Sequence, residues 1–134
     1  MVVAGRSRVG KSVYVARATA AAPRLLVYDP KCHPRDYPDC NAIGSFAVLA
    51  ASVAHAGRGA GRYRYCDATA KHFGDFCRLA FAWNFHHGQV VAVAEELPAV
   101  TTPGKAPPEW WRLVAQGMGY GLNLYAVTQR PAES

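Results

Sequence analysis

The stretch GRSRVGKS, at residues 5–12, has the residue types and the spacing of a loop that holds phosphate groups. It matches the pattern G-x-x-x-x-G-K-[ST] at every defined position. Glycines let backbone N–H groups approach phosphate oxygens closely, and the helix expected to begin near Lys11 aims the positive end of its dipole at the same anion. Lys11 supplies a cation for the β- and γ-phosphates, and Ser12 supplies an oxygen ligand for Mg²⁺. The pattern therefore predicts a site for ATP and Mg²⁺, formed by Gly5, Arg6, Ser7, Arg8, Val9, Gly10, Lys11, Ser12 and Val13.

Two adjacent carboxylates, Glu95 and Glu96, follow the most strongly strand-like run of the chain, Gln89 to Ala94. Enzymes with parallel sheets place their ligands at the carboxyl ends of the strands. Neighbouring residues of a strand point to opposite sides, so only one of the two faces the nucleotide directly. We predict that Glu95 joins Ser12 in holding Mg²⁺, and that Glu96 acts with Lys11 in catalysis by polarising the attacking water. The alternative is a solvated strand end.

A third polar group follows the last strand-like run, Leu122 to Val127, in the sequence Thr128-Gln129-Arg130-Pro131. A polar side chain at this position could contact the γ-phosphate or the attacking water, and Gln129 is the candidate. A turn with a polar border explains the same residues equally well.

The elements that must position these groups alternate between strands and helices. The expected strands are continuously apolar, which is typical of a parallel sheet with helices on both faces. We therefore expect a three-layer α/β fold in a single domain, residues 1–134. The chain stops a few residues after the last expected strand, so we expect a sheet that is incomplete at its C-terminal side. The strands are expected at 1–4, 25–28, 62–66, 89–94 and 122–127, and the helices at 11–22, 45–56, 70–85 and 109–116, with loops at 31–41 and 98–108.

Composition fits a packed domain with a phosphate-rich partner. Of the 134 residues, 51% are hydrophobic and 18% are charged, which permits a core and argues against disorder. The net charge of +6 suits association with an anionic partner but says nothing of the fold. No secretory signal is visible, and the longest apolar stretch, 43–56, is shorter than the ~20 residues that span a bilayer. We expect a cytosolic location.

The four cysteines, Cys32, Cys40, Cys66 and Cys77, are not spaced as metal ligands, because no C-x2-C or H-x3-H pair accompanies them. In a reducing compartment we expect all four to be free thiols.

Basic and aromatic residues alternate over Arg62-Tyr63-Arg64-Tyr65. Arg62, Arg64 and the loop at Arg58 could meet nucleic-acid phosphates, and the two tyrosines could stack on bases. An ordinary strand with one solvated face is the alternative, and it is the better supported of the two.

Five segments together resemble the FtsK–HerA superfamily of P-loop ATPases, and most closely the genome-packaging ATPases of phages and viruses with an internal membrane. The order and spacing of the segments agree over nearly the whole chain. The first is common to all P-loop proteins, whereas the last, following a second strand that ends in Asp-Pro-Lys, is much more particular. The segments are GRSRVGKS at 5–12, VYDPK at 27–31, VVAVAEEL at 90–97, GYGL at 119–122 and TQRPAE at 128–133.

The resemblance implies a RecA/ASCE-like sheet, in which an extra strand separates the phosphate-loop strand from the acidic strand. It also implies ATP-driven movement of double-stranded DNA through a homo-oligomeric, commonly hexameric ring, with capsid or membrane-vertex proteins as further partners, in the host cytoplasm or on the virion. Carried over by position, Lys11 and Ser12 bind phosphate and Mg²⁺, Glu95 replaces the usual aspartate, Glu96 is the catalytic carboxylate and Gln129 is the sensor. Gly117-Met118 stands where relatives often carry an arginine.

Three other functions compete with a packaging motor. A phage-assembly or conjugation ATPase of the zonula-occludens-toxin type usually carries a membrane segment. A small-molecule kinase needs an arginine-rich lid, for which Arg58 and Arg62 are available, but paired glutamates favour water as the acceptor. A non-hydrolysing nucleotide-binding module would use ATP only to organise assembly. A GTPase is disfavoured because no Asn-Lys-x-Asp motif occurs.

Overall fold

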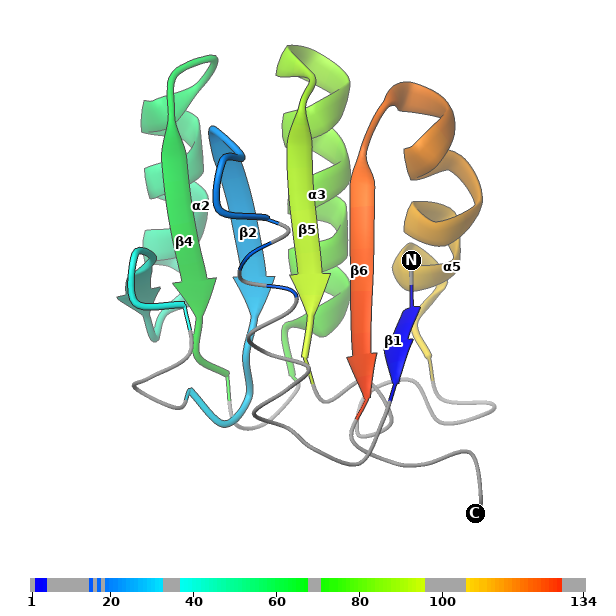
Figure 1. Cartoon of the computed structure of the whole chain (residues 1–134), viewed down its shortest axis with the longest axis horizontal. Coiled ribbons are helices and arrows are strands. Elements are labelled where there is room, and N and C mark those ends of the chain that lie inside the picture. The colour runs from blue at the N-terminus through cyan, green and yellow to red at the C-terminus, as the bar shows by residue number, and fades with distance from the viewer. Residues whose placement is uncertain are drawn as a thin grey trace.

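The computed structural model describes residues 2–4, 15, 17, 19–32, 37–67, 71–95 and 106–128. Within them, six strands form one sheet in the order β1-β6-β5-β2-β4-β3, and every neighbouring pair is parallel. The carboxyl ends of the strands therefore meet at one edge, as the arrowheads in Figure 1 show. The strands are β1 (Val2–Ala4), β2 (Arg24–Tyr28), β3 (Asn41–Ile43), β4 (Gly61–Tyr65), β5 (Val90–Ala94) and β6 (Asn123–Thr128).

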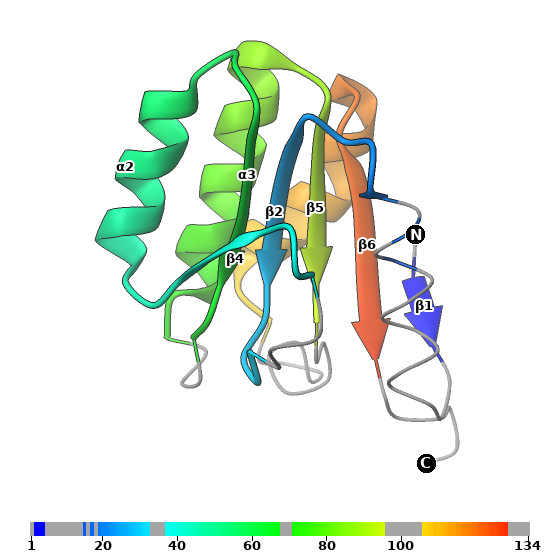
Figure 2. The ribbon, with the colours of Figure 1, turned by 60° about the vertical axis from the view of Figure 1, so that its left-hand side comes forward.

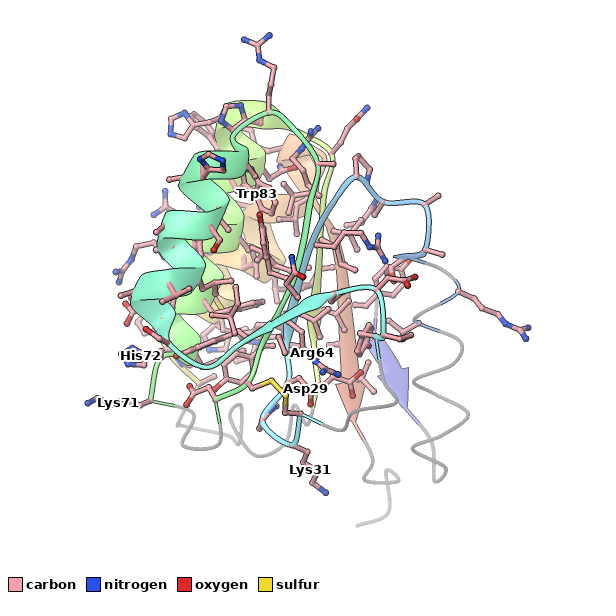
Figure 3. All side chains as sticks on the ribbon, turned by 90° about the vertical axis from the view of Figure 1, so that its left-hand side faces the viewer. Asp29, Lys31, Arg64, Lys71, His72 and Trp83 are labelled. Carbon is pink, nitrogen blue, oxygen red and sulfur yellow. A yellow bond between two sulfur atoms is a disulfide. The ribbon has the colours of Figure 1, made fainter. Side chains whose placement is uncertain are left out.

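One face of the sheet is covered by three helices, α2 (Phe46–Ala56), α3 (Phe73–His87) and α5 (Pro108–Arg112), which Figures 1 and 2 show on the same side of the strands. A π-helical turn, Leu113–Gly117, and a 3₁₀ turn, Met118–Tyr120, continue α5 toward β6. Ser45 caps α2 at its N-terminus, with its hydroxyl accepting from the Val48 N–H. Trp83 of α3 donates to the carbonyl of Gly57 at 2.7 Å, just beyond α2 (Figure 3).

The core divides into two layers because alternate residues of each strand face opposite sides of the sheet. Leu26 and Tyr28 of β2 pack against the helices, whereas Leu25 and Val27 face the other way. This second face is covered by residues from before and after β2, and the cluster there comprises Val15, Leu25, Val27, Tyr37, Cys40, Val91, Val93 and Val127. Both faces of the central strands β2 and β5 are thus buried, which explains why these two strands are almost entirely apolar.

The predicted elements agree with the structure in type and order. Of the helix expected at 11–22, the structure describes residues 15, 17 and 19–22. The backbone is helical at Val15, Arg17 and Thr19. The three-residue strand β3 was missed, because Asn41–Ile43 is largely exposed and follows a proline-rich segment that reads as loop. No helix in the described ranges combines the length and apolarity needed to cross a bilayer.

The prediction of four free thiols was wrong for one pair. Cys32 and Cys66 form a disulfide with 5.2 Å between their Cα atoms, and it ties the segment after β2 to the end of β4. Cys40 and Cys77 are free and buried. The pairing depends on β2 and β4 being sheet neighbours, which the sequence spacing does not reveal.

The idea that Arg62 and Arg64 meet nucleic acid is also not supported by their contacts. β4 is an interior strand, and Arg62 donates to the carbonyls of Thr19 (3.1 Å) and Ala22 (2.8 Å). The Arg64 side chain is buried and lies 4.0 Å from the Asp29 carboxylate. Tyr65 is buried in the core. The alternation of basic and aromatic residues therefore reflects a strand whose two faces both pack inward.

Reduction of the disulfide is expected to lower the free energy of unfolding. The bridge closes a loop between residues 34 positions apart, and chain entropy alone then predicts a loss of about 3–4 kcal/mol. Urea unfolding with and without dithiothreitol measures this loss. In the Cys32→Ser/Cys66→Ser double variant the reductant should have no effect; an equal loss there would contradict the assignment of the effect to this bridge.

Arg64→Met is expected to destabilise the fold by about 3 kcal/mol, because the buried Asp29 carboxylate loses a neighbouring cation. The matched control is Arg58→Met, which alters an exposed arginine and should change stability by less than about 0.5 kcal/mol. Equilibrium urea unfolding of the two variants decides the matter. Equal stabilities would mean that the Arg64 side chain has no structural role.

Candidate nucleotide-binding site

The predicted site residues follow three strands that lie side by side. β1 leads into the phosphate loop, β5 into Glu95 and β6 into Gln129. Ala4 pairs with Thr128, so the segments after β1 and β6 leave the sheet at the same level. Residues 5–13, Glu96 and Gln129 themselves lie outside the described residues; Glu95 lies within them.

Strand β6 lies between β1 and β5, so an extra strand separates the phosphate-loop strand from the acidic strand. This is the arrangement that the sequence resemblance implies, and it is confirmed. Neighbouring strands are about 4.8 Å apart, which places β1 and β5 about 10 Å from each other. Strand β6 therefore ends between the carboxyl ends of β1 and β5.

Glu95 is fully buried at the carboxyl edge of the sheet. Its backbone N–H donates to the Tyr28 carbonyl at 2.9 Å, which extends the β5–β2 ladder by one step. Because Val91, Val93 and Glu95 alternate along one strand, the glutamate side chain is on the face away from α2 and α3. On this face the Tyr37 hydroxyl donates to Glu95 Oε2 at 2.5 Å.

A second buried carboxylate, Asp29, stands beside Glu95 on the neighbouring strand. The register of Tyr28 with Ala94 makes Asp29 and Glu95 the first residues past their strands, on the same face. Asp29 Oδ1 accepts the Cys32 N–H at 2.9 Å, and the Arg64 guanidinium lies 4.0 Å from Oδ2. Figure 3 shows Asp29 and Arg64 close together beside the disulfide.

The helix-covered face carries a separate polar pair at the same edge. The Tyr28 hydroxyl donates to Asp67 Oδ2 at 3.0 Å, and the His72 N–H donates to the same oxygen at 3.2 Å. Burial, and next the Asp67 carboxylate, raise the pKa of the Tyr28 hydroxyl, which keeps it a donor. Asp67, Lys71 and His72 line an open pocket of about 650 Å³. Glu95 is not among its lining residues, so we do not assign this pocket to the nucleotide.

The described part of the site fits Mg²⁺. Magnesium takes oxygen ligands, and nucleotide sites bind it through one or two carboxylates together with phosphates. Glu95 supplies such a carboxylate at the edge where the phosphate-loop strand ends. It is also a longer acid than aspartate, so its carboxylate needs a contact that fixes it, and the Tyr37 hydroxyl makes one.

Sequence reasoning assigned no role to Tyr37 or Asp29, and it considered Arg64 only as a possible nucleic-acid contact. Asp29 stood within a motif of the resemblance, at the end of an apolar strand, and that position was a usable signal. Tyr37 had no such signal, since it is an aromatic residue among prolines, 58 positions from its partner. The charge of Arg64 indicated an exposed contact, whereas the fold buries it.

The sequence and the structure were compared with those of known proteins. No protein-family model matches the sequence. The sequence is 34% identical over 135 residues to protein P9 of Pseudoalteromonas phage PM2, and the match covers 98% of this chain and 59% of P9. The chain thus spans about three fifths of that relative's length.

The structure matches the genome-packaging NTPase B204 of Sulfolobus turreted icosahedral virus 2 in complex with ATP-gammaS. The TM-score is 0.71 at 16% identity, over 96% of this chain and 64% of B204. A second match is the crystal structure of B204, the DNA-packaging ATPase from Sulfolobus turreted icosahedral virus. Its TM-score is 0.69 at 18% identity, over 96% of this chain and 64% of B204. The structural similarity is to a viral genome-packaging NTPase, as the sequence resemblance implied, and this chain has the P-loop NTPase fold of B204.

Proposed function

We propose that this chain is an ATP-hydrolysing motor subunit that moves double-stranded DNA during viral genome packaging. The observation that carries the proposal is the strand order β1-β6-β5: the strands that precede the phosphate-loop pattern, Gln129 and the glutamate pair end at one edge of the sheet. The shared fold with B204, whose own description is a DNA-packaging ATPase, supports it. So does the similarity to protein P9 of phage PM2.

Each predicted residue is assigned a part in hydrolysis. Backbone N–H groups of residues 5–13 and the Lys11 ammonium bind the phosphates, and Ser12 and Glu95 hold Mg²⁺. When bound, Mg²⁺ neutralises charge on the β- and γ-phosphate oxygens. Glu96 accepts a proton from the attacking water and orients it in line with the γ-phosphate. Gln129, after the intervening strand β6, contacts the γ-phosphate or that water.

The motor is proposed to act as a homo-oligomeric ring, hexameric as the superfamily resemblance implies, with the duplex in its channel. Capsid or membrane-vertex proteins are the further partners, in the host cytoplasm or on the virion. The net charge of +6 supports binding to a polyphosphate. The proposed DNA-contacting surface does not include Arg62 and Arg64, because their side chains make internal contacts.

Of the competing functions, the kinase fits the described residues least well. Arg62, one of two arginines available for a kinase lid, donates to the carbonyls of Thr19 and Ala22. A module that only binds nucleotide would use Glu95 for Mg²⁺ in the same way, so turnover of ATP separates it from a hydrolase. An assembly ATPase of the zonula-occludens-toxin type remains the runner-up within the superfamily, and DNA stimulation separates it from a packaging motor.

Steady-state ATP hydrolysis is expected to rise several-fold on addition of double-stranded DNA. Lys11→Ala should lower the rate about 100-fold or more, because the charge that stabilises the transferred phosphoryl group is lost. Lys71→Ala, which removes an exposed lysine outside the motif, should leave hydrolysis without DNA unchanged. ATP-dependent displacement of a triplex-forming strand from the duplex measures movement directly. ATP binding with no turnover in either condition would contradict the motor and leave the non-hydrolysing module.

Glu96→Gln is expected to lower the hydrolysis rate about 10²- to 10⁴-fold, because the amide cannot accept the proton of the attacking water. ATP affinity should stay within a few-fold of the parent chain, since Glu96 is not assigned to the phosphates or to Mg²⁺. Glu109→Gln, a change of the same kind at a residue that pairs with Arg78, is the control and should keep full activity. Full activity of Glu96→Gln would move the catalytic role to another carboxylate.

A further inference from the structure

Tyr37 and Glu95 form the closest side-chain contact at the described edge of the site. The hydroxyl donates to Glu95 Oε2 at 2.5 Å, and both residues are buried, with exposed fractions of 3% and 0%. A hydrogen bond from a phenol to a carboxylate is strengthened by the charge of the acceptor and by exclusion of water. The contact therefore restricts the orientation of the Glu95 carboxylate.

The tyrosine is held in place independently of the glutamate. Its ring packs in the cluster with Val91, Val93 and Cys40, and its carbonyl accepts the Cys40 N–H at 3.0 Å. Its backbone has a φ of +51°, in the left-handed region that residues with bulky side chains seldom adopt. Backbone strain of this kind persists where the surrounding structure enforces it, and it is concentrated at functional sites. The Tyr37 hydroxyl is thus a fixed point to which a mobile side chain can be anchored.

Glu95 needs such an anchor more than an aspartate would. A glutamate has one more rotatable bond, so its carboxylate samples more positions and loses more entropy when it binds a metal. By engaging Oε2, the tyrosine fixes rotation about the last bonds of the side chain and sets the direction of Oε1 as well. A hydrogen-bond partner behind a metal ligand commonly has this role, because it orients the ligand before the metal arrives.

We propose that Tyr37 is a positioning residue that holds the Glu95 carboxylate in the orientation required to bind nucleotide-associated Mg²⁺. This inference rests on the proposed function, since it presumes the Mg²⁺–ATP site. The inference adds Tyr37 to the proposed site. Tyr37 lies in the segment between β2 and β3, 58 positions before Glu95 in the sequence. The pair acts as a unit, so the role of Tyr37 depends on a glutamate being present at position 95.

The test measures binding and does not require turnover or DNA. The affinity for a fluorescent, non-hydrolysable ATP analogue is determined with Mg²⁺ and with EDTA, and the ratio of the two affinities is the magnesium coupling. Tyr37→Phe, which removes one oxygen and keeps the ring, should lower the magnesium coupling about tenfold. Affinity in EDTA should be unchanged, a separation that a merely structural defect would not give.

Two comparisons make the result specific. Tyr63→Phe also removes a partly buried hydroxyl, one that donates to the Ser52 carbonyl at 3.3 Å, and it should leave the magnesium coupling intact. In a Glu95→Asp background, Tyr37→Phe should change the magnesium coupling by less than about twofold, because the shorter acid no longer reaches the hydroxyl. Thermal unfolding of each variant shows whether it is folded.

The outcomes separate this inference from the proposed function. Loss of the magnesium coupling in Tyr37→Phe alone supports the inference even if the parent chain proves unable to hydrolyse ATP or to move DNA. An unchanged coupling in Tyr37→Phe overturns the inference and leaves the motor function standing. Equal effects of Tyr37→Phe in the glutamate and aspartate backgrounds overturn it too, as does a parent chain whose nucleotide affinity is indifferent to Mg²⁺.

Discussion

All strand pairs of the described sheet are parallel, and the rest of the structure depends on this constraint. Parallel pairing sends every connection back across a face of the sheet, and so it collects the carboxyl ends of the strands at one edge. Groups that are far apart in the chain become neighbours there. Asp29 and Glu95 stand side by side because Tyr28 pairs with Ala94, although 66 positions separate the two acids in the numbering.

Buried charge at this edge is the clearest departure from what stability alone would favour. Asp29, Arg64 and Glu95 are all at least nine-tenths buried, and charged side chains at such depth are costly unless polar groups surround them. The structure supplies those groups from separate segments: the Cys32 N–H and the Arg64 guanidinium for Asp29, and the Tyr37 hydroxyl for Glu95. Buried ionisable groups of this kind are concentrated at functional sites.

The segment that follows β2 connects these groups. It begins at Asp29, and the Cys32–Cys66 disulfide joins it to the residue after β4. At Tyr37 it returns to the sheet and contacts Glu95. The same stretch looked like an ordinary surface loop because it is rich in proline and polar residues. Its importance comes from its place in the fold, beside the acidic strand and at the edge where the phosphate-loop strand ends.

Local sequence predicted the elements and the proposed chemistry of the site. Apolar runs indicated the order of strands and helices, because such signals act over a few residues. The phosphate-loop pattern and the glutamate pair predicted an ATP site for the same reason. The family resemblance added the strand between β1 and β5, and the structure confirms it.

The long-range contacts could not be predicted from the sequence. The Cys32–Cys66 bridge, the burial of Arg64 and the bond from Tyr37 to Glu95 all depend on strand order and register, which no spacing along the chain encodes. The strand β3 was missed because a three-residue edge strand owes its conformation to its neighbour β4 rather than to its own residues. The sequence thus indicated the acid of the proposed site, and the fold revealed the tyrosine that contacts it. The physical reason is that propensity is local, whereas the partners of a buried charge are set by how the whole sheet is assembled.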